Sequence, residues 1–337
     1  MPENKAERQI LDGTRDTGKT YEFAEDHDRN APAQIWFQKS HEGEVLFLVF
    51  YSQACRWSRC LGCNLPSKSS QYHVDYKALM AQVDHVFALP EVGARSREIS
   101  KVILSNNGSM LDHVTFSTTA LMYLLARINQ HLPNVTVLTL ETRPEYVELL
   151  ELEMLSRVLK EGDTATRLEL AVGFEAYDDH IRNDVFHKGL DLAKLEKLAA
   201  DLGSYDFGLK CYLMQKPVPG MSDAEGVEDV RKAIDYLHGL VEKHGTDVNL
   251  HLNPTYAAQG TPLAESFLSG EYSPPRLHDV AEAVRHARGK QLSVFVGLYD
   301  EGLAVEGGSF LRPGDEPLVE KLEQFNRTQD YDVLEGL

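Results

Sequence analysis

The 337-residue sequence has no long apolar run. A membrane-spanning helix needs about 20 consecutive, mostly apolar residues, and charged or polar residues interrupt every apolar stretch before that length. The first 16 residues are charged throughout and lack the apolar core that a secretory signal requires. We therefore expect a cytoplasmic protein with no membrane partner.

Positive charge is also in short supply. The chain has 34 Lys and Arg residues against 52 Asp and Glu residues, and its formal net charge is −18. Proteins that bind nucleic acid unaided use clustered Lys and Arg to neutralise phosphates. The charge balance excludes a broad basic surface and favours a small-molecule substrate, or one that a partner delivers. A local basic patch in a cleft leaves direct nucleic-acid binding open.

Cysteine is scarce, but its placement is informative. Four cysteines are too few for a disulfide scaffold at this length, and Cys211 lies in a strand pattern typical of a buried structural thiol. Cys55, Cys60 and Cys63 fall within nine residues, and three thiolates this close can bind one soft metal centre. Zinc needs a fourth ligand, which His73 could supply. A [4Fe–4S] cluster with three thiolates leaves one iron open to a small molecule.

Strand and helix patterns alternate along most of the chain. Residues 1–30 are polar and mixed in charge, and we expect a loosely ordered lead-in there. Two strand patterns, 35–40 and 44–52, form a hairpin. Further strands are expected at 101–106, 135–141, 167–175, 207–215, 248–254 and 291–299, and helices at 76–89, 119–132, 144–159, 190–203, 223–245 and 274–289. Repeated units of this kind imply parallel strands, in a doubly wound sheet or a complete or partial barrel.

Polar residues follow six of the expected strands, at the point where each strand ends. They are Cys55, 106–109, 141–143, Glu175, 216–217 and 253–254. The carboxyl ends of parallel strands form the functional edge of both fold types. We therefore expect a site at this edge, although the segment 106–109 alone also has the composition of an ordinary turn.

The motifs at the strand ends resemble those of the radical S-adenosylmethionine (SAM) superfamily, in the branch that is similar to the Elongator catalytic subunit. The matching segments are the three-cysteine loop, SNNGSMLD from Ser105, ETRPEYV from Glu141, VGFEAYDDHIRNDVFHKG from Val172 and KCYLMQKPVPGMSDAEGVEDV from Lys210. A further segment from Leu252 resembles most closely the archaeal radical SAM lyases that complete archaeosine in tRNA. The matches cover residues 44–300 in the family's order. The cysteine spacing is four then two residues, where the superfamily usually has three then two.

The resemblance implies an α/β fold, a partial (β/α) barrel of six to seven parallel strands at 44–300. An N-terminal extension with a hairpin strand is expected at 1–43 and an acidic extension at 301–337, with no acetyltransferase domain. Cys55, Cys60 and Cys63 would ligate a [4Fe–4S] cluster, and SAM would chelate the fourth iron. An external donor of flavodoxin or ferredoxin type would supply the electron that cleaves SAM to a 5′-deoxyadenosyl radical.

The radical would abstract hydrogen from a substrate, and the reaction would be of lyase or transferase type. The resemblance implies a modified nucleobase or a 7-deazapurine-like compound as substrate. The alternative is a zinc-binding barrel protein that uses the three cysteines and His73 and performs no radical chemistry.

The resemblance also implies roles for charged and polar residues. Asn106, Asn107 and Ser109 would offer oxygens to the SAM ammonium, Glu175 would accept from the ribose hydroxyls, and Arg182 would bind the SAM carboxylate. Glu141 and Arg143 would bind SAM, bind substrate or pair with each other. For the segment around Arg182, an exposed helix with an internal salt bridge is the alternative. Trp57 is a candidate for adenine stacking or for packing.

Substrate would meet the radical near residues of the last strands. Lys210, Tyr212 and Lys216 are the expected catalytic residues, and Asn253, Gln259 and His251 are further candidate contacts. Lys216 stands beside a proline in a loop, where a solvated charge is the ordinary alternative to an anion ligand.

Overall fold

The computed structural model describes residues 5–337, and these divide into two compact units. The first unit comprises the chain up to Gly13, Glu22–Ser58 and Leu65–Val172. The second comprises Thr14–Tyr21, Arg59–Asn64 and Gly173–Leu337. The boundaries expected from the sequence, at residues 43 and 300, stay a prediction.

The first unit is built on strands that are neighbours in the order of the sequence. They are β1 (Gln34–Ser40), β2 (Gly43–Val49), β3 (Ile99–Ser105), β4 (Val137–Thr142) and the greater part of β5 (Arg167–Glu175). The strand β1 is antiparallel to β2, and β2 to β5 are parallel. Gly43 closes the β1–β2 turn at a φ of 103°, a conformation that side chains disfavour.

The second unit contains three parallel strands, again in sequence order. They are β6 (Gly208–Gln215), β7 (Val248–Pro254) and β8 (Ser293–Val296). A doubly wound sheet reverses its strand order at a switch point, whereas neither unit contains a reversal. The order is therefore that of a (β/α) barrel, and the predicted α/β class with successive parallel strands is confirmed.

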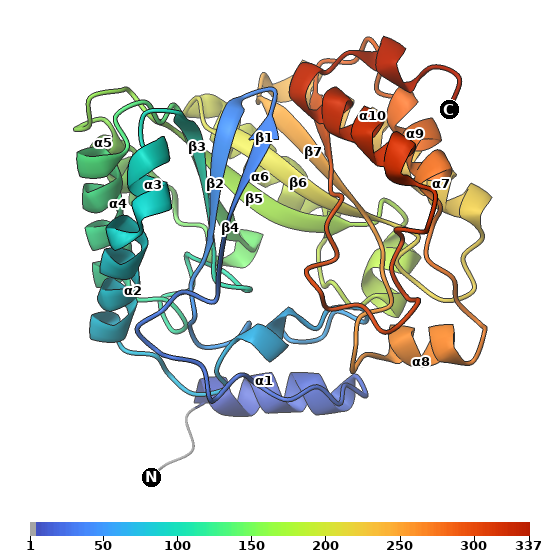
Figure 1. Cartoon of the computed structure of the whole chain (residues 1–337), viewed down its shortest axis with the longest axis horizontal. Coiled ribbons are helices and arrows are strands. Elements are labelled where there is room, and N and C mark those ends of the chain that lie inside the picture. The colour runs from blue at the N-terminus through green and yellow to red at the C-terminus, as the bar shows by residue number, and fades with distance from the viewer. Residues whose placement is uncertain (1–4) are drawn as a thin grey trace. The chain divides into compact units, whose positions relative to one another are not determined.

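Helices connect the parallel strands and cover them from outside. The described helices are α1 (Lys5–Asp16), α2 (Tyr76–Ala88), α3 (Pro90–Arg95), α4 (Thr118–His131), α5 (Leu149–Leu159), α6 (Leu192–Ser204), α7 (Asp223–His244), α8 (Pro262–Leu268), α9 (Leu277–Arg285) and α10 (Glu316–Thr328). Figure 1 shows α2, α4 and α5 side by side in the first unit, and α7, α9 and α10 gathered in the second. The predicted capping box at Ser222 and Glu225 starts α7.

Strands that are apolar on both faces hold the core of the first unit. On one face, Val45, Phe47 and Ile103 form a buried cluster, and Trp36 stacks on Phe47 with 4.0 Å between ring centroids. The other face of β2 and β3 carries the fully buried Leu48 and its neighbours. Burial of each large apolar side chain stabilises the folded state by about 1.5–3 kcal/mol. Strands in the core therefore need apolar side chains, and this is why apolar runs in the sequence predicted them.

Two expectations about helices were wrong. Residues 1–4 of the expected lead-in lie outside the described residues. From residue 5 onward the lead-in is not loosely ordered, because α1 occupies Lys5–Asp16 and buries Ala6 and Ile10, spaced four residues apart on one face. The helix expected at 144–159 is broken. A short 3₁₀ turn covers Pro144–Tyr146, and α5 begins only at Leu149. No helix within residues 5–337 is long and apolar enough to cross a membrane.

Candidate functional site

The three clustered cysteines lie in the loop that follows β2. Cys55 belongs to the first unit, and Cys60 and Cys63 belong to the second. All three are half-buried thiols, whereas Cys211 is buried in β6. Within residues 5–337 no three His, Cys, Asp or Glu side chains form a ready-made metal centre, so ligation by these cysteines stays a prediction. His73, the alternative zinc ligand, is exposed.

The segment after β3 is tightly packed and carries an acceptor atom without a partner. Asn106 is fully buried, and its Nδ2 donates to Ser52 Oγ at 3.1 Å, but its Oδ1 accepts no hydrogen bond from any residue within 5–337. A Cβ at Gly108 would lie 3.2 Å from Cys55 Cα, so this segment presses directly on the first cysteine. A buried, unpaired acceptor is costly and would fit an ammonium donor, as the resemblance implies for SAM.

The other two residues of this segment are held by hydrogen bonds. Asn107 adopts a left-handed φ of 58°, and its backbone N–H donates to Ser105 Oγ. Ser109 Oγ lies 2.6 Å from Thr142 Oγ1 at the end of β4. The turn after β3 is therefore tied to the next strand along the sheet, and its three predicted SAM contacts share one rigid loop.

Arg143 and Glu141 lie at the end of β4. Arg143 is buried, forms an ion pair with Glu145, and its guanidinium carbon lies 4.6 Å from the centroid of the Trp57 ring. The backbone carbonyl of Glu141 accepts from Met110 N–H at 2.8 Å. Trp57 therefore packs against the arginine at the end of β4, which is one of the two roles that the sequence left open for it. The other role, stacking on adenine, stays a prediction.

Glu175 ends β5 in a left-handed conformation and pairs with a lysine. Its φ is 67°, and its Oε1 lies 2.8 Å from Lys188 Nζ. The pair crosses over Gly173, where a Cβ would come within 2.2 Å of both groups. A side chain at position 173 would displace the ends of both side chains, so this glycine leaves room for the Glu175–Lys188 pair at the strand end.

The structure does not support the SAM carboxylate as the partner of Arg182. The side chain is fully buried, and it donates four hydrogen bonds within its own loop. The acceptors are the carbonyls of Leu190, Ala176 and Tyr177 and the carboxylate of Asp179. The internal salt bridge of the alternative is present, between Arg182 and Asp179, but the arginine side chain is buried and does not lie on an exposed helix face. The sequence did not reveal this structural role, because the local composition is the same whether an arginine side chain points inward or into solvent.

Lys216 also has its partners within the second unit. It is buried, with a φ of 59°, and its Nζ lies 2.6 Å from Asp223 Oδ1 at the start of α7 and 3.2 Å from Ser273 Oγ. Tyr272 donates its hydroxyl to the Lys216 carbonyl. The sequence suggested either a solvated charge or a ligand for a substrate anion at Lys216. In the structure its ammonium instead joins the β6–α7 loop to the start of α7.

Lys210 and Tyr212 face the same side of β6, where three strands in register form successive rows of side chains. The first row is Lys210, Asn249 and Ser293, the second is Tyr212, His251 and Phe295, and the third is Met214, Asn253 and, beyond the end of β8, Gly297. The first row is joined by hydrogen bonds through Asn249. In the second row the His251 ring lies 4.9 Å from that of Tyr212 and 4.8 Å from that of Phe295.

A carboxylate that sequence reasoning missed supports the loop after β5. Asp229, on α7, accepts from the backbone N–H groups of Tyr177 and Asp178 at 2.9 and 2.8 Å. Burial raises the pKa of this carboxyl above its ordinary value. The same loop reaches the cysteines of the second unit, because Phe186 accepts from Leu61 N–H at 2.9 Å. No local pattern marks Asp229, whose partners lie about fifty residues earlier.

One motif match is excluded by its surroundings. Residues 13–20, GTRDTGKT, match the phosphate-binding pattern GxxxxGK[ST], which requires a loop at the N-terminus of a helix. Here the segment lies at the C-terminal end of α1. The backbone N–H groups of Gly18 and Lys19 donate to the Arg15 and Thr14 carbonyls, and a helix C-terminus repels phosphate.

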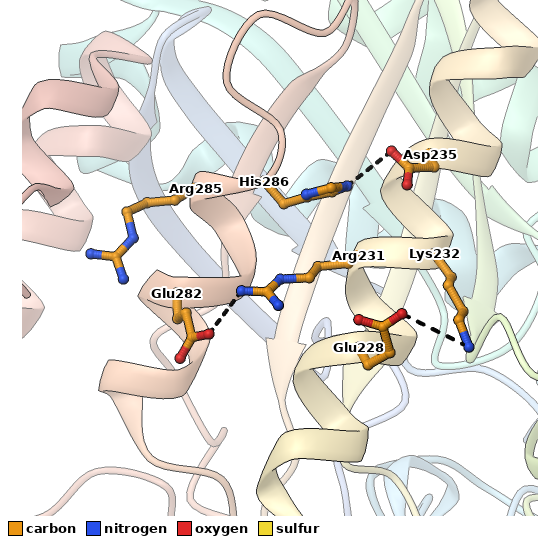
Figure 2. A pocket seen from close by; sticks show the side chains of 7 residues that line it. All are labelled: Glu228, Arg231, Lys232, Asp235, Glu282, Arg285 and His286. Carbon is orange, nitrogen blue, oxygen red and sulfur yellow. Dashed lines mark hydrogen bonds and ion pairs between the residues drawn. The ribbon is translucent and has the colours of Figure 1, made fainter.

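A groove of about 610 Å³ lies between α7 and α9, away from the strand ends. Figure 2 shows its lining, which is Glu228, Arg231, Lys232, Asp235, Glu282, Arg285 and His286. Arg231 pairs with Glu282 at 2.7 Å and His286 with Asp235 at 2.9 Å. Exposed pairs of this kind contribute little, and charged side chains that pair with one another make up the lining, so we do not regard the groove as the site.

Comparison with known proteins gives related sequences. Archaeosine synthase subunit beta of Methanosarcina acetivorans is 27% identical over 266 residues, which cover 77% of this chain and 72% of that protein. The protein of the same name from Thermococcus kodakarensis is 23% identical and covers 88% of both chains. The chain is similar in sequence to archaeosine synthase subunit beta. This confirms the resemblance that the motifs predicted, and no family model matches the sequence.

Solved structures add nothing further. Elp3 of Methanocaldococcus infernus is 19% identical, with a TM-score of 0.45, and the match covers 65% of this chain and about half of that protein. The fold therefore rests on the strand order described above, and kinship rests on the archaeosine synthase relatives.

Proposed function

We propose that this protein is a radical SAM enzyme that acts on a modified nucleobase. Cys55, Cys60 and Cys63 would hold a [4Fe–4S] cluster with SAM at its open iron. The observation that carries the proposal is the loop after β3. It presses Gly108 onto Cys55 and buries an acceptor, Asn106 Oδ1, that has no partner among the described residues. Kinship with archaeosine synthase subunit beta supports the same reading.

The donor set fits such a group. Three half-buried cysteines lie in one nine-residue loop, and thiolate sulfur is the ligand that iron–sulfur clusters use. When bound, the cluster supplies one electron that cleaves SAM to a 5′-deoxyadenosyl radical, which abstracts hydrogen from the substrate. A flavodoxin or ferredoxin would provide that electron.

The residues of the chain would bind and orient the reactants. Asn106 Oδ1 would accept from the SAM ammonium, with Asn107 and Ser109 on the same loop. Glu175, held by Lys188 at 2.8 Å, would accept from the ribose hydroxyls with its remaining acceptor capacity. Arg143 would screen negative charge at the end of β4. These contacts would fix SAM against water before the electron arrives.

The rows of side chains on β6, β7 and β8 favour a flat, polar substrate. The rings of Tyr212 and His251 present faces and edges that pack well against a heterocycle, and the Asn253 amide carries both a donor and an acceptor. Lys210, buried beneath them, would face a substrate oxygen or anion. We propose Lys210 and Tyr212 as the catalytic residues, and a nucleobase, free or in a tRNA that a partner delivers, as the substrate.

The test is reductive cleavage of SAM. Protein purified and reconstituted with iron and sulfide without oxygen would be reduced with dithionite and supplied with SAM, and 5′-deoxyadenosine would be measured. We expect several turnovers from the wild type, none from Cys55→Ala, and wild-type turnover from Cys211→Ala, which removes a buried thiol outside the loop. A colourless protein that holds zinc and leaves SAM intact would refute the proposal and favour the zinc alternative.

A further inference from the structure

The first cysteine of the loop is positioned by contacts within the first unit. Four residues separate Cys55 from Cys60, one more than the superfamily usually has. Ser58 adopts a left-handed φ of 47° and is buried, and its hydroxyl donates to the Cys55 carbonyl. The chain therefore turns back immediately after Cys55, and this turn accommodates the additional residue.

The residue next to Cys55 forms a two-point ion pair. Arg56 Nε donates to Asp112 Oδ2 at 2.6 Å, and Arg56 Nη2 donates to Asp112 Oδ1 at 2.7 Å. The Asp112 side chain is only 4% exposed. The Tyr146 ring lies 5.2 Å from the guanidinium carbon, and burial raises the pKa of this phenol to about 12. Geometry of this kind is specific to arginine, because lysine cannot match two carboxylate oxygens.

Asp112 belongs to the loop that contains Asn106 and Gly108. Its N–H donates to the Ser109 carbonyl, and its carboxylate accepts from Val114 N–H. The pair therefore joins the cysteine loop to the loop proposed to bind SAM. Cys55 is fixed from two directions, by the Gly108 backbone behind it and by the Arg56–Asp112 pair beside it.

We propose that Arg56 and Asp112 are positioning residues for the first cluster ligand. The pair holds the chain at Cys55 in place before any metal binds, and it fixes the Arg56 charge on the residue next to the ligand. This inference rests on the proposed function for its redox part only. Its structural part concerns the apo protein and can be tested alone.

The first experiment measures alkylation of Cys55 by iodoacetamide in the folded apo protein. Cleavage after Arg59 separates the peptide of Cys55 from that of Cys60 and Cys63, so mass spectrometry reports each rate. We expect Arg56→Lys and Asp112→Asn to change the Cys55 rate severalfold while the Cys211 rate stays constant. Lysine preserves the charge at position 56 but loses the two-point geometry. Arg56→Lys therefore tests the positioning role even if a variant that also removes the charge, such as Arg56→Gln, fails to fold.

Arg95→Lys is the matched control. Arg95 pairs with the buried Glu44 at 2.7 Å and lies 4.4 Å from the Phe37 ring, the same three-part arrangement at a place without cysteine. Its replacement should leave the Cys55 rate at the wild-type value. Equal Cys55 rates in wild type, Arg56→Lys and Asp112→Asn would overturn the positioning role.

The second experiment measures the midpoint potential of the reconstituted cluster. A positive charge beside the ligand favours the reduced cluster, so Arg56→Gln should lower the potential, Asp112→Asn should raise it, and Arg56→Lys should leave it unchanged. A role confined to folding would not separate these three variants in this order. If no cluster assembles in the wild type, the proposed function fails, and the alkylation result still decides the positioning role.

Discussion

Replacement of Arg182 by methionine should destabilise the protein without removing a SAM ligand. The buried guanidinium is a hydrogen-bond partner of the Ala176 and Tyr177 carbonyls, whereas the Leu190 carbonyl also accepts from Asn183 Nδ2. Two carbonyls would therefore lose this donor. Each unpaired buried group costs about 1–3 kcal/mol, which gives about 2–6 kcal/mol of unfolding free energy, a large share of the stability of an ordinary domain.

Thermal unfolding followed by circular dichroism measures this effect. At about 2 °C per kcal/mol for a chain of this size, Tm should fall by about 4–12 °C in Arg182→Met. Arg157→Met is the control, because that exposed side chain pairs with Glu153 one turn away, and its loss should cost at most about 0.5 kcal/mol. At 15 °C, where both variants are folded, SAM affinity should stay within about threefold of wild type. An unchanged Tm with a tenfold or greater loss of SAM affinity would refute the structural role.

Three further changes test other parts of the account. Lys101→Met should cost about 3–5 kcal/mol in urea unfolding, because Lys101 Nζ is buried 2.7 Å from Glu42 Oε2 and 2.8 Å from Glu169 Oε1. Burial lowers the pKa of Lys101, but Glu169 and Glu42 raise it by more, so the net shift is upward. The difference in unfolding free energy between wild type and Lys101→Met should therefore be constant from about pH 7 to 9 and disappear only above about pH 10.5. A difference that disappears by pH 8 would contradict this. Gly108→Ala should cost about 1–3 kcal/mol through overpacking against Cys55, whereas Gly93→Ala, with open space around it, should raise Tm slightly; equal Tm shifts would contradict the close approach. Asn106→Ala should weaken SAM binding to the reconstituted protein about tenfold, the loss of about 1.4 kcal/mol, and an unchanged affinity would remove Asn106 from the SAM site.

The parallel strands were predictable because they are buried on both faces. The runs at 167–175 and 248–254 match β5 and β7 to the residue, since apolar residues recur at every second position of both runs, which is the period of a strand. The start of α7 was predictable from its capping box, which is a local signal. The helix α1 was missed because only two of its buried residues, Ala6 and Ile10, carry apolar side chains, whereas Gly13 and Thr14 complete the inner face.

The site was less accessible to sequence reasoning than the fold. The cysteine loop and the segment after β3 were found because strand ends attract functional residues. The Arg56–Asp112 pair joins residues 56 positions apart, and nothing in either local sequence indicates the other. Arg182 and Lys216 were predicted to be ligands because the sequence around a charged residue does not show whether its side chain faces solvent, a cofactor or buried carbonyls. Tertiary packing alone decides among these.

The SAM-dependent change in the electron paramagnetic resonance spectrum of the reduced protein tests the central claim most directly. The account predicts a reduced [4Fe–4S] signal in reconstituted wild type whose g-values shift when SAM is added, because SAM binds at the iron that the three cysteines leave open. The same shift should be present in Cys211→Ala and absent in Cys55→Ala. A wild-type spectrum that is identical with and without SAM, or a protein that assembles no cluster, would contradict the account.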